Sequence, residues 1–156
     1  MRISELLNET TMKIDLEARN KSGAIEELVD LLVEEHEISL ADRSHVIQAI
    51  LQREEMVSTG MEYGVALPHG AVSCVEEVVA ALGVSKQGLD FQSIDGRLTY
   101  IIILLVLPKE KYSAGVRTMA GISRVLTSDG LRDRLRAAGD AGEIMDIIIE
   151  EDDRQC

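Results

Sequence analysis

An unbroken apolar run, Tyr100–Leu107, restricts the possible fold more than any other part of this sequence. The run has the length of a β-strand and is rich in β-branched isoleucine and valine residues. Because strand side chains alternate between the two faces of a sheet, a strand that is apolar throughout must be covered on both faces. We therefore expect Tyr100–Leu107 to be the central strand of a sheet that has helices on both faces.

Amphipathic patterns on either side of this strand predict those helices. Apolar side chains at helical spacing predict a helix over residues 22–36 and a second helix that ends near Glu55. The last third has the same pattern, with Asp140 and Glu143 as a capping box before the closing helix. Val78–Val84 is a further predicted strand. This alternation favours an α/β fold, and the absence of any linker or repeat favours one domain over residues 1–156.

Composition excludes several classes of protein. With 46% apolar residues the chain can form a substantial core, which must be aliphatic because only 3% of residues are aromatic. A formal charge of −12 disfavours nucleic acids and anionic membranes as partners, since both require basic surface. The longest apolar run is too short to cross a bilayer, and the polar start is not a signal peptide. We expect a soluble, cytoplasmic protein with no membrane insertion and no disulfide framework.

The segment Ser58–Gly70, STGMEYGVALPHG, contains the best candidate for chemistry. Its histidine, His69, lies between a proline and a glycine and follows a short predicted strand, Val65–Leu67. Pro68 restricts the backbone on the N-terminal side of His69, while Gly70 lets another group approach closely on the other side. The pattern predicts an imidazole presented by a stiff backbone. The alternative is an ordinary loop histidine beside a turn.

A presented imidazole suits phosphoryl transfer. A neutral ring nitrogen is nucleophilic near pH 7, so a histidine can accept a phosphoryl group and pass it on. The other histidines, His36 and His45, lack the spacing of metal ligands, and we expect no metal site. The sequence has no P-loop, dinucleotide fingerprint or nucleophile-elbow serine, so it implies no organic cofactor.

The same segment resembles a known family. STG followed by a glycine-flanked loop and Pro-His-Gly is similar to the active-site signature of enzyme IIA domains of the fructose/mannitol class in the bacterial phosphoenolpyruvate-dependent sugar phosphotransferase system. The resemblance extends through Ile50–Gly60 (ILQREEMVSTG) and Leu89–Gly96 (LDFQSIDG), and it is strongest to the nitrogen-regulatory branch. It implies a single type-2 IIA domain with a central mixed β-sheet and helices on both faces.

The resemblance also implies roles for individual residues. His69 would accept a phosphoryl group, on Nε2, from the phosphocarrier protein HPr or an HPr-like relative. It would then pass the group to a IIB domain or keep it as a mark read by a regulatory target protein. Arg53 would stabilise the phosphoryl oxygens, unless it is only a solvated arginine at a helix end. Residues with supporting roles around the phosphoryl group would be Ser58, Thr59, Gly60 and Gly70.

Two departures from the family pattern leave a second function open. Glu62 adds a carboxylate to the glycine loop, and Gly115 occupies the position at which the family tends to have a second histidine. The chain is therefore either a histidine phosphocarrier or a phosphorylation-independent regulatory binding protein with a degenerate IIA fold. The sequence does not decide whether it is an enzyme component of sugar uptake or a regulator, and it names neither the sugar nor the oligomeric state.

Overall fold

A computed structural model describes residues 2–155 of the chain. Its elements, in chain order, are α1 (Ile3–Leu6), η1 (Glu9–Thr11), β1 (Met12–Lys13), α2 (Lys21–Glu34), η2 (Leu40–Asp42), α3 (Arg43–Met56), η3 (Glu62–Gly64), β2 (Val65–Ala66), β3 (His69–Val72), β4 (Val79–Leu89), β5 (Thr99–Pro108), η4 (Lys109–Lys111), α4 (Tyr112–Val125), α5 (Asp129–Ala137) and α6 (Ala141–Gln155).

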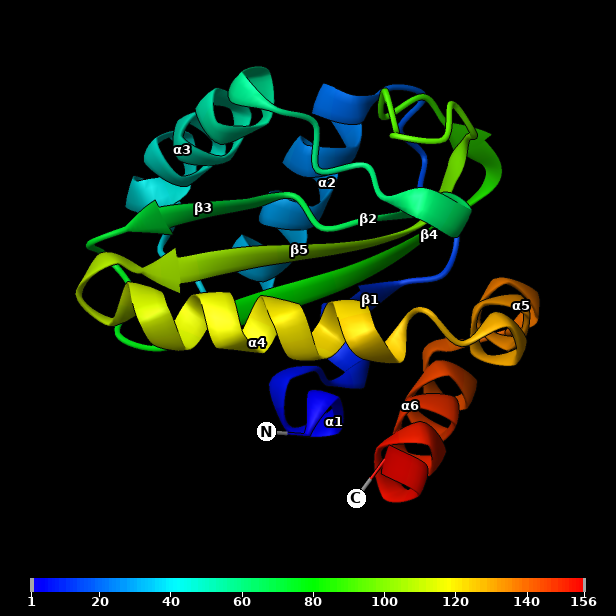
Figure 1. The fold of residues 1–156 in the computed structure, drawn as a ribbon. Coiled ribbons are helices and arrows are strands. Elements are labelled where there is room, and N and C mark those ends of the chain that lie inside the picture. The colour runs from blue at the N-terminus through cyan, green and yellow to red at the C-terminus, as the bar shows by residue number, and fades with distance from the viewer. Residues whose placement is uncertain (1, 156) are drawn as a thin grey trace.

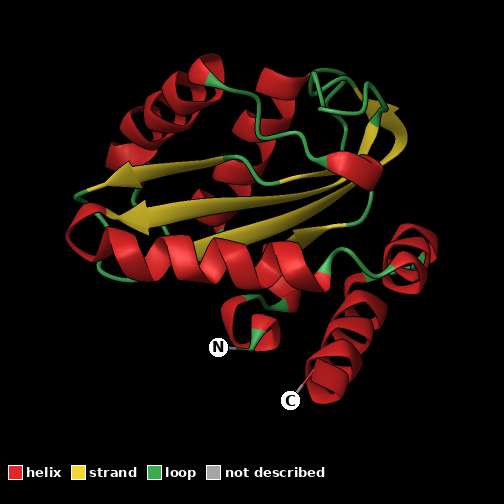
Figure 2. Cartoon of the chain, viewed as in Figure 1, coloured by secondary structure: helices red, strands yellow, loops and turns green. Residues whose placement is uncertain are grey.

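The sheet is mixed and β5 lies inside it, as predicted for Tyr100–Leu107 (Figures 1 and 2). β4 pairs with one side of β5 in antiparallel orientation, and β1 pairs with β4 in parallel. β2 and β3 follow one another along the other side of β5, both parallel to it. The predicted strand Val78–Val84 is confirmed, but β4 continues to Leu89 because its end bulges and still pairs with β5.

Helices cover both faces of this sheet, which confirms the expected fold class. In Figure 1, α4 crosses one face while α2 and α3 lie on the other. Alternate side chains of β5 divide between the two resulting cores: Leu104 packs with residues of α2 and α3, and Leu105 packs with residues of α4, α5 and α6. Both leucines have no exposed surface. The strand predicted to be apolar on both faces is therefore buried on both faces.

The first and last helices, α1 and α6, lie side by side. Asp152 of α6 accepts hydrogen bonds from the backbone N–H groups of Ile3 at 3.1 Å and Ser4 at 2.8 Å. Arg2 forms an ion pair with Asp153 next to them. Carboxylates near a short helix's N-terminus are favourably placed for its unpaired N–H groups. These contacts attach α1 to α6.

The sequence patterns missed two short strands. β1 has only two residues, and β3 begins at His69, where the sequence pattern predicted no strand. Both lack the alternation or length that identifies a strand in sequence, and pairing with β4 and β5 makes them strands. Within residues 2–155, no helix has both the length and the apolar character needed to cross a membrane.

Candidate functional site

His69 is the first residue of an edge strand and its ring is partly buried. Pro68 precedes it, and its register partner on β5 is Leu105. The Nδ1 atom of His69 lies 2.9 Å from the Leu67 carbonyl oxygen. Because a carbonyl oxygen only accepts, Nδ1 must carry the proton in this hydrogen bond. The lone pair is then on Nε2, the nitrogen that can act as a nucleophile.

The environment of His69 keeps its imidazole neutral. Burial lowers the pKa of His69 below its usual value, and the positive charge of Arg53 lowers it further. The hydrogen bond to Leu67 and the negative charge of Glu54 act in the opposite direction but do not outweigh burial. The ring is therefore an uncharged base near pH 7. The charges that act on it come from α3, and the Glu62 carboxylate is not among them.

Arg53 lies in the last turn of α3. One of its N–H groups, on Nη1, donates to the Val57 carbonyl at 2.9 Å, beyond the helix end. This contact is the one expected of an arginine at a helix C-terminus, where cations are favoured. The remaining donors of the guanidinium are left for another acceptor, and its charge reaches His69. The contact with Val57 is that of a helix-end arginine, and stabilisation of phosphoryl oxygens by Arg53 stays a prediction.

Next to Arg53, a buried ion pair fixes the start of the glycine loop. The Glu54 carboxylate accepts hydrogen bonds from the Thr59 backbone N–H at 2.9 Å and from its hydroxyl at 2.5 Å. Lys21, at the start of α2, lies 2.9 Å from the same carboxylate. Glu54 is almost fully buried. Sequence reasoning missed this Lys21–Glu54–Thr59 network, because nothing in a linear sequence pairs α2 with α3.

The hydroxyl and amide groups of the Ser58–Gly60 stretch bind the protein itself. The Ser58 hydroxyl donates to the Phe91 carbonyl and accepts from the Gly60 N–H at 3.0 Å. A Cβ at Gly60 would lie 2.5 Å from the Ser93 hydroxyl, so only glycine allows this approach. Both donors of Thr59 are directed to Glu54. In this arrangement Ser58, Thr59 and Gly60 hold the loop that leads to His69.

Gly70 allows the close approach predicted from its missing side chain, and the group that approaches is the backbone of α3. A Cβ at Gly70 would lie 2.9 Å from the Ile50 nitrogen and 3.0 Å from the Ala49 carbonyl carbon, both in the α3 backbone. The absent side chain therefore lets α3 pack directly against β3. This close packing brings the end of α3, with Arg53, towards the strand that starts at His69.

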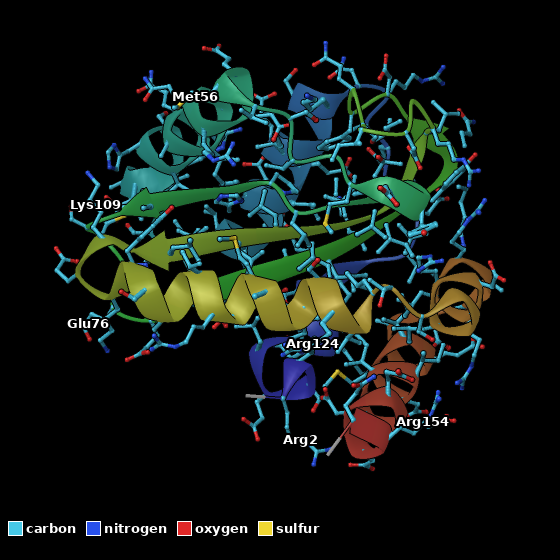
Figure 3. All side chains as sticks on the ribbon, in the orientation of Figure 1. Arg2, Met56, Glu76, Lys109, Arg124 and Arg154 are labelled. Carbon is cyan, nitrogen blue, oxygen red and sulfur yellow. The ribbon has the colours of Figure 1, made fainter. Side chains whose placement is uncertain are left out.

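The outer edge of β3 offers further donors. The Leu105 N–H donates to the Pro68 carbonyl at 3.0 Å, and in a parallel ladder this register directs the N–H groups of His69 and Ala71 away from β5. A hollow beside Ala71 is lined by Arg53, Lys109 and His45, among others. Figure 3 labels Lys109 beyond the end of β5 and Met56, also in the lining, at the end of α3. Two cations, Arg53 and Lys109, thus line the hollow at the free edge of β3.

Gly115 is buried on α4 and lies against Leu107 of β5. A Cβ there would be 3.0 Å from a Leu107 methyl carbon, so a larger side chain would crowd this contact. Leu107 pairs with Ala71, which follows His69 by two residues. The side chain of Leu107 lies in the core that α4 covers. Gly115, at the position where the family tends to have a second histidine, is therefore near the end of β3.

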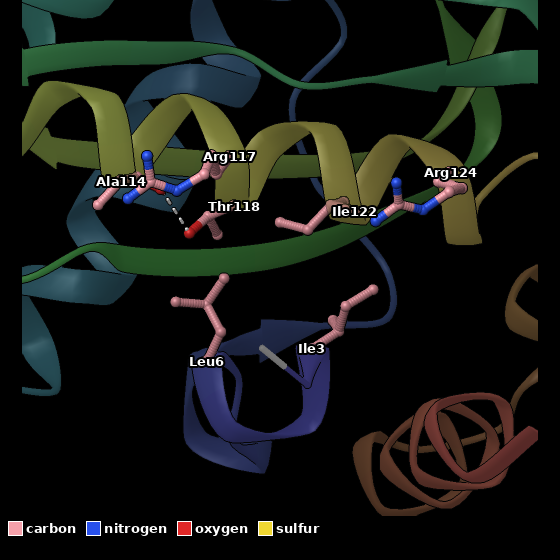
Figure 4. Close-up of a pocket in the computed structure, with 8 residues that line it drawn as sticks. Ile3, Leu6, Ala114, Arg117, Thr118, Ile122 and Arg124 are labelled. Carbon is pink, nitrogen blue, oxygen red and sulfur yellow. Dashed lines mark hydrogen bonds between the residues drawn. The ribbon is translucent and has the colours of Figure 1, made fainter. Parts of the chain in front are cut away.

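A separate hollow between α1 and α4 contains none of the predicted site residues (Figure 4). Ile3 and Leu6 of α1 point towards α4, and Thr118 donates to the Ala114 carbonyl at 3.0 Å. No histidine, cysteine or carboxylate is among the described residues that line it. Throughout residues 2–155, no group of three or more His, Cys, Asp and Glu side chains is placed to hold a metal ion.

Comparison with known proteins identifies the family. The sequence model for the phosphoenolpyruvate-dependent sugar phosphotransferase system, EIIA 2, matches residues 5–151. The chain belongs to this EIIA family. It is similar to the nitrogen regulatory protein of Bradyrhizobium diazoefficiens, with 28% identity over 148 residues and 95% of both chains covered.

A longer relative shares the same region. The PTS system fructose-specific EIIABC component of Bacillus subtilis is 31% identical over 152 residues, which are 97% of this chain but 24% of that protein. Among solved structures, the nitrogen regulatory protein IIA-Ntr from Neisseria meningitidis superposes with a TM-score of 0.84 at 25% identity, covering 94% of this chain and 98% of that one. These EIIA relatives confirm the family resemblance and the fold class, and they support a phosphocarrier role in the phosphotransferase system.

Proposed function

We propose that this chain is a phosphocarrier that accepts a phosphoryl group on Nε2 of His69 from HPr or an HPr-like protein. The observation that carries the proposal is the hydrogen bond between Nδ1 of His69 and the Leu67 carbonyl, at 2.9 Å. It fixes the tautomer and leaves the Nε2 lone pair available. Family membership supplies the substrate class, a phosphoryl donor of the phosphotransferase system.

In the transfer step, the Nε2 lone pair attacks the phosphorus atom while the bond from phosphorus to the donor atom breaks. The developing charge is spread over the phosphoryl oxygens, so catalysis depends on positioning and on nearby donors. Arg53 provides a guanidinium beside the imidazole, and the N–H groups of His69 and Ala71 lie at the open edge. Ser58, Thr59, Gly60 and Gly70 act indirectly, by holding the loop and α3 in place.

The phosphorylated chain then has two possible uses. The fructose-specific relative carries EIIA together with EIIB and EIIC parts, which supports relay of the phosphoryl group to a IIB domain. The nitrogen regulatory relative supports use as a regulatory mark read by a target protein. In both uses the chain acts in the cytoplasm together with HPr. In both it acts as a single IIA domain over residues 1–156.

The test is intact-mass measurement after incubation with phosphoenolpyruvate, enzyme I and HPr. We expect a gain of one phosphoryl group, about 80 Da, that disappears in His69→Ala. His45→Ala is the matched control, since His45 lines the neighbouring hollow, and it should still gain the group. Absence of any gain would favour the alternative, a regulatory binding protein that keeps the fold without phosphorylation. A gain that survives His69→Ala would contradict the assignment of His69.

A further inference from the structure

A second cavity lies at the other end of the β2–β3 edge from His69. Its volume is about 680 Å³, and it lies between the glycine loop, the turn before β5, and α5. Val65, next to the cavity residue Gly64, pairs with Ile101, whereas His69 pairs with Leu105. At the rise per residue of a strand, those register positions are roughly 13 Å apart along β5. This cavity is therefore distinct from the phosphoryl site.

Three arginines converge on this cavity. Arg97 comes from the turn before β5, and Arg132 and Arg136 come from α5. Asp133 is the one carboxylate among the described lining residues, and Asp95, next to the cavity, lies 3.9 Å from Arg97. The three arginines outnumber these two carboxylates. The chain as a whole carries −12. A local excess of positive charge in such an acidic protein is an electrostatic focus for anions.

Two tyrosine rings hold two of these arginines in place. The Arg136 guanidinium lies 3.6 Å from the centre of the Tyr100 ring, and the Arg132 guanidinium lies 4.4 Å from the centre of the Tyr63 ring. Arg132 also donates to the Leu126 carbonyl at 2.7 Å. Stacking on a ring uses the face of a guanidinium and leaves the N–H donors in its plane for hydrogen bonds. A stacked guanidinium also loses less side-chain entropy on binding an anion than a mobile one does.

The backbone makes room for this stacking. Gly88 has φ +84°, and a Cβ there would lie 2.9 Å from the Tyr100 ring. Gly64 has φ +78°, and a Cβ there would lie 3.2 Å from the same ring. Tyr63 itself has φ +66°, a left-handed conformation that is unfavourable for a bulky side chain. Two glycines and one strained tyrosine thus support a pair of stacked arginines.

We propose that this cavity binds a small molecule that carries two adjacent phosphate groups. Guanidinium forks match phosphate oxygens, and several of them around one cavity suit a diphosphate better than a single phosphate. The volume leaves room beyond the diphosphate, so the anion can be inorganic pyrophosphate or the diphosphate of a nucleotide. The net charge of −12 disfavours a nucleic acid as the occupant.

The test is calorimetric titration of the whole chain with inorganic pyrophosphate, orthophosphate and ADP. We expect saturable binding of pyrophosphate, about tenfold tighter than that of orthophosphate. Tighter binding of ADP than of pyrophosphate would identify a nucleotide as the occupant, and weaker binding of ADP would identify the inorganic anion; either result supports the site. Absence of saturable binding by both diphosphates would overturn the proposal.

Arg136→Ala should weaken pyrophosphate binding by about tenfold. Arg134→Ala is the matched control: it removes the same charge from the same helix, but Arg134 pairs with Glu150 at 2.9 Å and does not line the cavity. It should bind as the natural chain does. Equal losses in the two variants would show non-specific attraction and contradict the site. Thermal unfolding of Arg136→Ala checks that this variant still folds. Arg97→Ala is a second variant, which removes a lining arginine at a solvent-exposed position.

Binding at this cavity is separable from the proposed phosphoryl transfer. His69→Ala should bind pyrophosphate unchanged, because His69 does not line the cavity. If His69→Ala abolished binding, the anion would occupy the phosphoryl site and the proposal of a second site would be wrong. A failure of phosphorylation with intact pyrophosphate binding would contradict only the proposed function.

Discussion

At the residue scale, the reactivity of His69 depends on which ring nitrogen carries the proton. The Leu67 carbonyl selects Nδ1–H, and burial disfavours protonation of the second nitrogen. Pro68 and Gly70 predicted a presented imidazole, but the partner of Nδ1 could not be predicted. That contact depends on how the chain turns between β2 and β3. The neutral nucleophile is therefore a property of the folded chain rather than of the Pro-His-Gly sequence.

The lowered pKa of His69 predicts a pH dependence of phosphorylation. Transfer requires the neutral ring, so the midpoint of the fall in rate should lie below about pH 6.5, the usual value for histidine. Single-turnover rates measured on both sides of this pH test the prediction, with donor phosphorylation followed separately. A midpoint above the usual value for histidine would contradict it.

The same pKa shift has a consequence for stability. Because the folded pKa lies below the unfolded one, the unfolded chain binds more protons as the pH falls below about 6.5, and the contribution of His69 to stability is lost there. His69→Ala should lack this contribution. Urea unfolding of both proteins at about pH 7.5 and about pH 5.5 is the measurement, and identical pH dependence in the two would contradict the assignment.

Arg53 should matter more for transfer than for folding. Arg53→Ala removes a cation from the site of developing negative charge, so the phosphorylation rate should fall by about tenfold or more. The lost bond to Val57 lies at an exposed helix end, so the melting temperature should change little. Arg43→Ala is a control, because Arg43 begins the same helix and pairs with Asp30. An unchanged rate in Arg53→Ala would leave Arg53 as a helix-end residue only.

At the element scale, the end of α3 and the glycine loop form one unit. Amphipathic spacing predicted α2 and α3, and the resemblance placed Arg53 and the Ser58–Gly60 stretch near His69. Neither predicted that Lys21 and Glu54 pair across the two helices or that Thr59 binds the same carboxylate. Such contacts join distant parts of the chain and leave no periodic signal. The sequence was enough to propose a candidate site, but the contacts that support the loop could not be predicted from it.

Glu54→Gln tests this unit. The substitution leaves Lys21 partly buried opposite a neutral side chain, so the free energy of unfolding should fall by about 3 kcal/mol. The amide of Thr59 should also exchange its hydrogen faster, since its acceptor is weakened. Glu55→Gln, on the exposed side of the same turn, should change neither quantity appreciably. Equal effects of the two substitutions would show that the buried network does not hold the loop.

At the scale of the whole molecule, one central strand joins two cores. The apolar run Tyr100–Leu107 predicted this arrangement correctly, because continuous burial leaves few other folds for such a strand. The excess of negative charge is also visible in the sequence, whereas the convergence of Arg97, Arg132 and Arg136 on one cavity is not. Their separation along the chain conceals the cluster until α5 packs beside the start of β5.

Leu104→Ala and Leu105→Ala test the coupling of the two cores. Both side chains are fully buried, one in each core, so each substitution should lower the free energy of unfolding by about 3 kcal/mol. Each variant should still unfold in a single transition seen equally by far-UV circular dichroism and by tyrosine fluorescence. Two separate transitions would show that the cores unfold independently and that β5 does not couple them.

The central claim, that His69 is a neutral acceptor through Nε2, is tested most directly by NMR of its ring nitrogens. Long-range proton–nitrogen spectra of the selectively labelled chain should show Nδ1 protonated and Nε2 unprotonated at about pH 7. After incubation with phosphoenolpyruvate, enzyme I and HPr, the phosphorus should be bonded to Nε2 of His69. A proton on Nε2 before the reaction, phosphorylation on Nδ1, or an unmodified ring afterwards would contradict the account.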